Sequence, residues 1–165
     1  MAIFHFSVQV ISRAAGRSSV SAAAYRAGER LHDERLDRDH DFRARSGVEH
    51  SEILLPEGAP EQWRDRERLW NDVEAFEKRK DAQLAREVEF ALPRELTKKD
   101  NIKLARAFVK AEFVEKGMIA VGPLTPGILH LSLTVPIHSH KSERSIFTSS
   151  NGGDSWQLVS TEEIN

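Results

Sequence analysis

Two segments of the chain alternate apolar side chains with polar or ionisable ones, which is the pattern of a strand that buries one face. In residues 2–11, phenylalanines and valines share one face and His5 lies on the other. In residues 86–92, apolar side chains again share one face, and Glu87 and Glu89 share the opposite one. A sheet built from these strands brings His5, Glu87 and Glu89 to one open face. That face is either a functional site or an ordinary solvated surface.

Helical and strand patterns alternate along the rest of the chain. In order, the sequence predicts a helix from Ser18 or Ser19 to about Leu31, an exposed loop or frayed helix over residues 31–47, a strand over 48–55, a helix over 60–80, and a helix after 97 that Thr97 caps. This order favours an α+β or α/β sandwich in which helices cover the apolar face of the sheet.

The composition changes at about Ala120. The 45 residues after it hold six of the chain's 50 charged residues and are rich in Ser, Thr, Gly and Pro. We therefore divide the chain into a first part, residues 1–120, and a tail, residues 121–165. The chain has no cysteine, which excludes disulfides and thiolate metal sites. No apolar run is long enough to span a bilayer, so a cytoplasmic location is expected.

Tyr25 is the only tyrosine, and alanines surround it in the sequence. Small neighbours leave room for a bulky substrate beside the ring, and a phenol can act as a covalent nucleophile when a base or metal helps it lose its proton. The alternative is a tyrosine packed on the core from a helix of small residues.

Four arginines flank this segment. Arg26 and Arg30 are four residues apart and would form a cationic ridge on one helix face. Arg13 and Arg17 lie just before the helix, where guanidinium groups and free backbone N–H groups suit phosphate. The net charge of −2 argues against a protein that coats nucleic acid nonspecifically, but it permits a local basic patch of this kind.

Three stretches, "MAIFHFSVQVISR", "GRSSVSAAAYRAGERL" and "QLAREVEFALPREL", occur in an order and spacing that resemble the MobA/MobL family of plasmid relaxases, including the TraA type. The resemblance covers residues 1–120. It implies an α+β fold with the antiparallel palm sheet of HUH-type relaxases and helices on one face. Because the tail departs from the family pattern, we expect this sheet to be incomplete. The turn residues Asn151, Gly152 and Gly153 favour a β-hairpin in the tail.

The resemblance also implies a function. Tyr25 matches the family's nucleophile, which nicks single-stranded origin-of-transfer DNA and stays attached to the 5′ phosphate. Glu87 or Glu89 matches the acidic position, as a base or as the orienter of a histidine. His5 matches a supporting histidine of the first strand. The expected partners are origin DNA and accessory relaxosome proteins, with no membrane.

A divalent metal, Mg²⁺ or Mn²⁺, is implied by the same resemblance and would be held by a histidine cluster. The tail offers His138 and His140, with His130 before them, but a charged segment follows His140 where the family has an apolar strand. The tail is therefore possibly foreign to the family. Three alternatives follow: a nicking enzyme, a binding module that recognises single strands without cutting, and an inactive truncated remnant.

Overall fold

A five-stranded antiparallel sheet forms the centre of the protein in the computed structural model, which describes residues 5–134, 142–148 and 157–164. From one edge to the other the strands are β1 (Phe6–Ser12), β5 (Gln83–Ala91), β7 (Ile128–Thr134), β6 (Ile119–Thr125) and β4 (His50–Leu54). The alternation predicted for the first and third strands is confirmed: Val8 pairs with Val88, and Gln9 pairs with Glu87 on the opposite face. The predicted α+β class is therefore correct.

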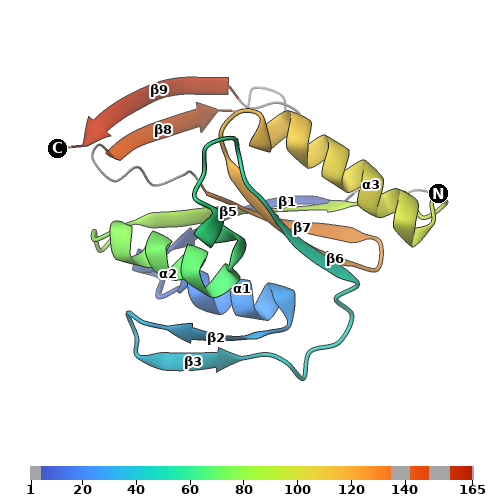
Figure 1. Cartoon of the computed structure of the whole chain (residues 1–165), viewed down its shortest axis with the longest axis horizontal. Helices are drawn as coiled ribbons and strands as arrows, with labels where there is room; N and C mark the ends of the chain where they lie inside the picture. Colours follow the sequence, from blue (N-terminus) through green and yellow to red (C-terminus); the bar gives the residue numbers. More distant parts are fainter. Residues whose placement is uncertain (1–4, 135–141, 149–156, 165) are drawn as a thin grey trace.

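Helices cover both faces of this sheet, not one (Figure 1). The helices α1 (Ser19–Ala27) and α2 (Arg66–Phe76) lie on one side, and α3 (Lys98–Val109), which continues into a π-helical turn η3 (Lys110–Val114), lies on the other. Two separate apolar cores result. Ala85 belongs to the core beneath α1 and α2, and Val88 belongs to the core beneath α3. Successive side chains of a strand point to opposite faces of the sheet, and here both faces carry apolar side chains. Helices therefore cover both faces.

The segment expected to be a loop or frayed helix is a β-hairpin instead. The first helix ends at Ala27 because Gly28 adopts a left-handed conformation, with φ at 67°. The strands β2 (Arg30–Asp33) and β3 (Arg38–Asp41) then pair antiparallel. Cross-strand contacts between arginine, histidine and aspartate satisfy the charges, so a segment without apolar periodicity still forms a hairpin.

The long helix expected over residues 60–80 is interrupted. A 3₁₀ turn, η2 (Glu61–Arg64), comes first, and α2 begins after Asp65, whose carboxylate accepts a hydrogen bond from the backbone N–H of Arg68. The predicted buried stripe is correct for Leu69 and Val73, whereas Phe76 is exposed.

The sheet is not incomplete. The strands β6 and β7 lie almost entirely after Ala120, and β7 occupies the position beside β5 inside the sheet. The composition boundary therefore does not coincide with an edge of the fold. Beyond these strands, β8 (Ser142–Thr148) and β9 (Gln157–Ile164) pair antiparallel as the expected hairpin.

Candidate functional site

The polar face of β5 lies on the same side of the sheet as α1. In the strand register Ser7 and His130 stand on either side of Glu89, and Gln9 and Ser132 stand on either side of Glu87. Nε2 of His5 lies 3.6 Å from Oε2 of Glu89. The structure therefore brings the predicted residues His5, Glu87, Glu89 and His130 together across three neighbouring strands.

Two guanidinium groups surround the carboxylate of Glu87, which is only 3% exposed. Nη2 of Arg17 lies 3.1 Å from Oε2, and Nε of Arg26 lies 3.4 Å from Oε1. A buried carboxylate needs such partners because its desolvation is costly. Glu87 thereby fixes the positions of both arginines at the edge of α1.

Arg26 also joins Glu87 to its neighbour Glu89. Its Nη1 lies 2.8 Å from Oε1 of Glu89 and 3.2 Å from Nδ1 of His130. The same His130 nitrogen lies 2.9 Å from the Glu89 carboxylate, and its Nε2 lies 3.0 Å from the hydroxyl of Thr125. The five side chains of Arg26, Glu87, Glu89, His130 and Thr125 form one connected polar cluster.

The surroundings of Glu89 and His130 lower the pKa of both side chains. Burial alone would raise the pKa of Glu89, but the hydrogen bond with His130 and the charge of Arg26 outweigh it, so the pKa lies below its usual value. Burial lowers the pKa of His130, with a further contribution from Arg26, against the opposing effect of Glu89. Near neutral pH the cluster therefore contains an ionised carboxylate and a neutral imidazole.

Tyr25 lies beside this cluster and is 45% exposed, so it is not a tyrosine sealed in the core. Its ring packs edge-to-face against Phe42, with 5.4 Å between ring centroids. The side chain of Arg45 lies over the ring, and its Nη1 donates a 2.6 Å hydrogen bond to the Tyr25 carbonyl oxygen. Directly before Tyr25 in α1, Ala23 and Ala24 are buried, and their small side chains let the helix pack closely on the core.

The other two predicted arginines are engaged elsewhere. Arg13 lies at the C-terminal end of α2, where its guanidinium pairs with Glu74 and donates to the carbonyl oxygens of Glu74, Glu77 and Arg79. Arg30 lies on β2 and pairs with Asp39 across the hairpin. The ridge expected from Arg26 and Arg30 does not form, because the helix ends between them.

The described residues do not fit a divalent metal well. Among them no group of three or more His, Asp and Glu side chains has an arrangement that could hold a metal ion. At the polar cluster, the guanidinium of Arg26 already occupies the side of Glu89 and His130 that a cation would need. The predicted ligands His138 and His140 lie outside the described residues. We therefore derive no chemical step through a metal.

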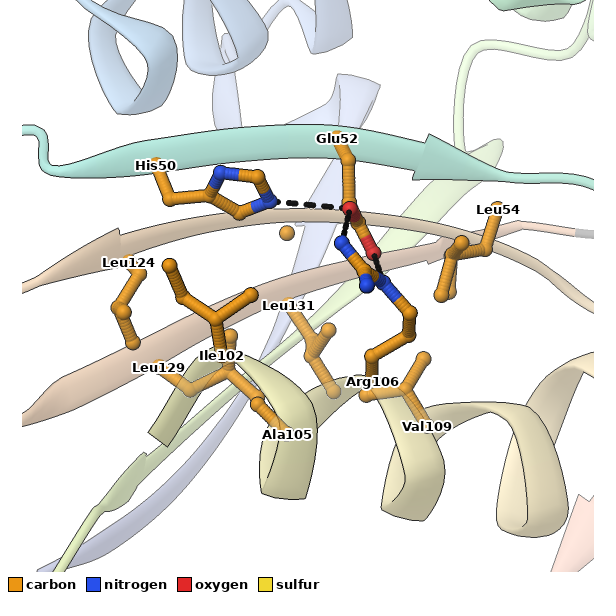
Figure 2. Close-up of a pocket in the computed structure, with 12 residues that line it drawn as sticks. His50, Glu52, Leu54, Ile102, Ala105, Arg106, Val109, Leu124, Leu129 and Leu131 are labelled. Carbon is orange, nitrogen blue, oxygen red and sulfur yellow. Dashed lines mark hydrogen bonds and ion pairs between the residues drawn. The ribbon is translucent and has the colours of Figure 1, made fainter. Parts of the chain in front are cut away.

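A small cavity lies on the opposite face of the sheet, beneath α3 (Figure 2). Its volume is about 30 Å³, and apolar side chains, among them four leucines, Ile102 and Val109, form most of its wall. At its rim Arg106 of α3 reaches Glu52 of β4 at 2.8 Å, and His50 contacts the same carboxylate at 2.9 Å. Arg106 lowers the pKa of Glu52 to about 2. This cavity is too small for an organic ligand, and the ion pairs attach α3 to the edge strand.

Sequence reasoning missed Arg45, Phe42 and Thr125. The first two lie in the charge-dense segment whose hairpin was not predicted, and Thr125 ends a strand that was assigned to the tail. The sequence around Arg45 gives no indication that its side chain contacts Tyr25, which lies 20 positions earlier.

The model of the MobA/MobL family matches residues 17–123, which include Tyr25, Glu87 and Glu89. The chain belongs to the MobA/MobL family. This MobA/MobL chain is 47% identical over 145 residues to the "Probable conjugal transfer protein TraA" of Sinorhizobium fredii, a match that covers 81% of the chain and 13% of the relative. It is 50% identical over 111 residues to the "Mobilization protein MobL" of Acidithiobacillus ferridurans, covering 67% of the chain and 29% of that protein.

A solved structure shares the fold of this MobA/MobL chain. Its title is "Molecular Basis of Vancomycin Resistance Transfer in Staphylococcus aureus"; the TM-score is 0.75 at 33% identity, over 81% of this chain and 70% of that one. A span of 81% of 165 residues cannot end at residue 120, so the similarity continues into the segment that was assigned to the tail. The chain spans less than a third of the length of the two relatives named above. No helix of the described residues is long and apolar enough to cross a membrane.

Proposed function

We propose that this MobA/MobL chain carries the DNA-nicking centre of a conjugal transfer or mobilisation protein, with single-stranded origin-of-transfer DNA as its substrate. The observation that carries the proposal is the half-exposed Tyr25, which lies between two arginines and beside the Glu87–Glu89–His130 cluster. Family membership and the conjugal-transfer relatives support it.

In the proposed reaction the Tyr25 hydroxyl oxygen forms a bond to phosphorus, and the bond to the leaving 3′ oxygen breaks. The phenolic proton passes to a carboxylate and from there to solvent, and the leaving 3′ oxygen takes up one proton from solvent water. Glu89 suits the accepting role better than Glu87, because the Glu87 carboxylate is buried between two guanidinium groups. Glu87 then acts by positioning Arg17 and Arg26, which face the phosphates of the strand.

The test is formation of a covalent adduct. A random-sequence single-stranded DNA library labelled at its 3′ end is incubated with the chain, with Mg²⁺, Mn²⁺ or EDTA, and run on a denaturing gel. The proposal expects a labelled protein band that wild type forms and Tyr25→Phe does not, while both proteins bind the library equally. An adduct that survives in Tyr25→Phe, or no adduct with either metal, would contradict it.

One observation favours the second candidate, a module that binds single-stranded DNA without cutting. The described residues hold no cluster suited to a metal ion, whereas the resemblance to relaxases implies a metal held by a histidine cluster. Such a module would bind the library with strong salt dependence and form no adduct under any condition. The third alternative, an inactive truncated remnant, was expected to have an incomplete sheet, whereas β7 stands between β5 and β6.

A further inference from the structure

A cavity of about 390 Å³ opens beside Tyr25, between α1 and the β2–β3 hairpin. Its volume lies within the range of small-molecule sites, roughly 300–1,000 Å³. The helix side contributes Arg17, Ser21 and Tyr25, and the hairpin side contributes Leu36 and Arg38. We infer that this cavity binds one nucleotide of a single DNA strand next to the phosphate that Tyr25 attacks. This inference rests on the proposed function and names a subsite for its substrate.

The charges of the cavity suit a phosphate. Three arginines line it, Arg17, Arg26 and Arg38, and Glu87 is the one carboxylate among the lining residues. Glu87 pairs with Arg17 and Arg26, whereas the exposed guanidinium of Arg38 has no hydrogen-bond or ion-pair partner among the described side chains. The wall therefore has an excess of positive charge and one guanidinium free to contact a phosphate oxygen.

Apolar side chains also line the cavity. Leu36, at the tip of the hairpin, is 39% exposed, and the rings of Phe42 and Tyr25 also line the space. A nucleobase packed against Leu36 and the aromatic rings would remove this apolar surface from water. A nucleotide has a base that suits the apolar surface of the cavity and a phosphate that suits its cationic surface. An isolated phosphate or a purely apolar ligand would contact only one of these two surfaces.

The cavity is held open by the fold itself. At the start of α1, the hydroxyl of Ser18 donates a 2.6 Å hydrogen bond to Asp33 of β2, which is fully buried. Nε2 of His40 on β3 lies 3.3 Å from the same carboxylate. These contacts join both hairpin strands to the helix, so the wall that carries Leu36 and Arg38 keeps its distance from Tyr25 without a ligand.

Binding without cleavage tests the inference. The full chain is titrated, in EDTA, into a fluorescent twelve-nucleotide oligothymidylate and into a strand of equal length with abasic sugars throughout, and anisotropy is recorded. We expect the oligothymidylate to bind at least about fivefold more tightly, which is the lower end of base stacking on protein side chains. Leu36→Ala should at least halve this ratio, and Arg38→Gln should weaken both probes alike and reduce the salt dependence.

Matched variants come from α3 on the opposite face of the sheet. Leu104 is 44% exposed and Lys103 is exposed, so Leu104→Ala and Lys103→Gln make the same chemical changes away from the cavity and should leave both affinities unchanged. Thermal melts check that each variant is folded. As a second readout on wild type, thymidine monophosphate should shift the amide resonances of Leu36 and Arg38 and not those of Lys103 and Leu104.

Two results would overturn the inference: equal binding of the abasic and thymidine strands, or equal effects of Leu36→Ala and Leu104→Ala. The outcome is independent of nicking. A chain that discriminates bases at Leu36 and forms no covalent adduct contradicts the proposed nicking function alone. If the chain forms the adduct and Leu36→Ala leaves the ratio of the two affinities unchanged, only the cavity assignment is contradicted.

Discussion

The guanidinium of Arg45 lies over the ring of Tyr25, with 4.2 Å from Cζ to the ring centroid, and its Nη1 donates to the carbonyl oxygens of Tyr25 and Arg26 at 2.6 and 3.3 Å. One side chain therefore fixes the orientation of the ring and satisfies carbonyl oxygens at the C-terminal end of α1. A cation in this position is also favoured by the helix dipole.

Replacing Arg45 should separate positioning from DNA binding. In Arg45→Ala we expect adduct formation to slow at least tenfold, because the ring loses the group that holds it, with a loss of about 1 kcal/mol of stability from the helix end and the cation–π contact. Binding of single strands should change far less. The measurements are the rate of adduct formation, the anisotropy titration and urea unfolding.

Arg43→Ala is the matched control, since the Arg43 side chain pairs with Asp41 and is exposed. Arg45→Lys keeps the charge and should recover part of the rate. If Arg43→Ala slows the reaction as much as Arg45→Ala, the effect is one of general charge and Arg45 does not position the tyrosine.

The pairing of Arg26 with Glu87 should dominate the stability of the site. Arg26→Gln leaves a buried carboxylate with Arg17 as its remaining cation, so we expect a loss of about 3 kcal/mol. The double variant Arg26→Gln, Glu87→Gln should be more stable than Arg26→Gln alone, because it removes the uncompensated charge. Urea unfolding of wild type, both single variants and the double variant checks this, and additive effects would show that the two residues do not interact.

Local sequence patterns predicted the parts of the fold that depend on local chemistry. The alternation around Val8 and Val88 identified two strands, and Thr97 was correctly expected to cap a helix. Of the two serines expected at the start of the first helix, Ser18 is the cap. Long-range pairing was not predictable in the same way. His130 faces Glu89 because β7 inserts between β5 and β6, and nothing near His130 in the sequence specifies that neighbour.

The β2–β3 hairpin shows a different reason for failure. Its buried residues include Asp33 and His40, so charged side chains replace the apolar periodicity on which a strand prediction relies. The contact of Arg45 with Tyr25 depends on where this hairpin returns the chain. The site includes residues of this hairpin and of the segment after it, so only part of the site could be predicted. Tyr25, Glu87, Glu89, Arg17 and Arg26 were expected, whereas Arg38, Phe42 and Arg45 were not.

His130 should make stability depend on pH. Its folded-state pKa lies below the ordinary 6.5, so the unfolded chain binds the proton more readily. The contribution of His130 is therefore fully present above about pH 6.5 and is lost as the pH falls toward the folded-state pKa. In His130→Gln, stability should fall less between pH 7 and pH 5 than in wild type. Chemical denaturation at several pH values checks this, and direct titration of the imidazole by NMR should give a pKa below 6.5; a pKa above that value would contradict the assignment.

The ion pair between Glu52 and Arg106 should contribute stability in a lower pH range. Arg106 lowers the folded-state pKa of Glu52 from its ordinary 4.5 to about 2, so the contribution of the pair is present above about pH 4.5 and is lost as the pH falls from there toward 2. Because both side chains are partly exposed, solvent screening limits the effect of Glu52→Gln to about 1 kcal/mol at neutral pH. Glu49→Gln, an exposed neighbour just before β4, is the matched control and should change stability by much less. Urea unfolding from pH 7 down to pH 3 should show the wild type and Glu52→Gln curves converging, and curves that stay parallel would mean that the pair does not hold α3 to the sheet.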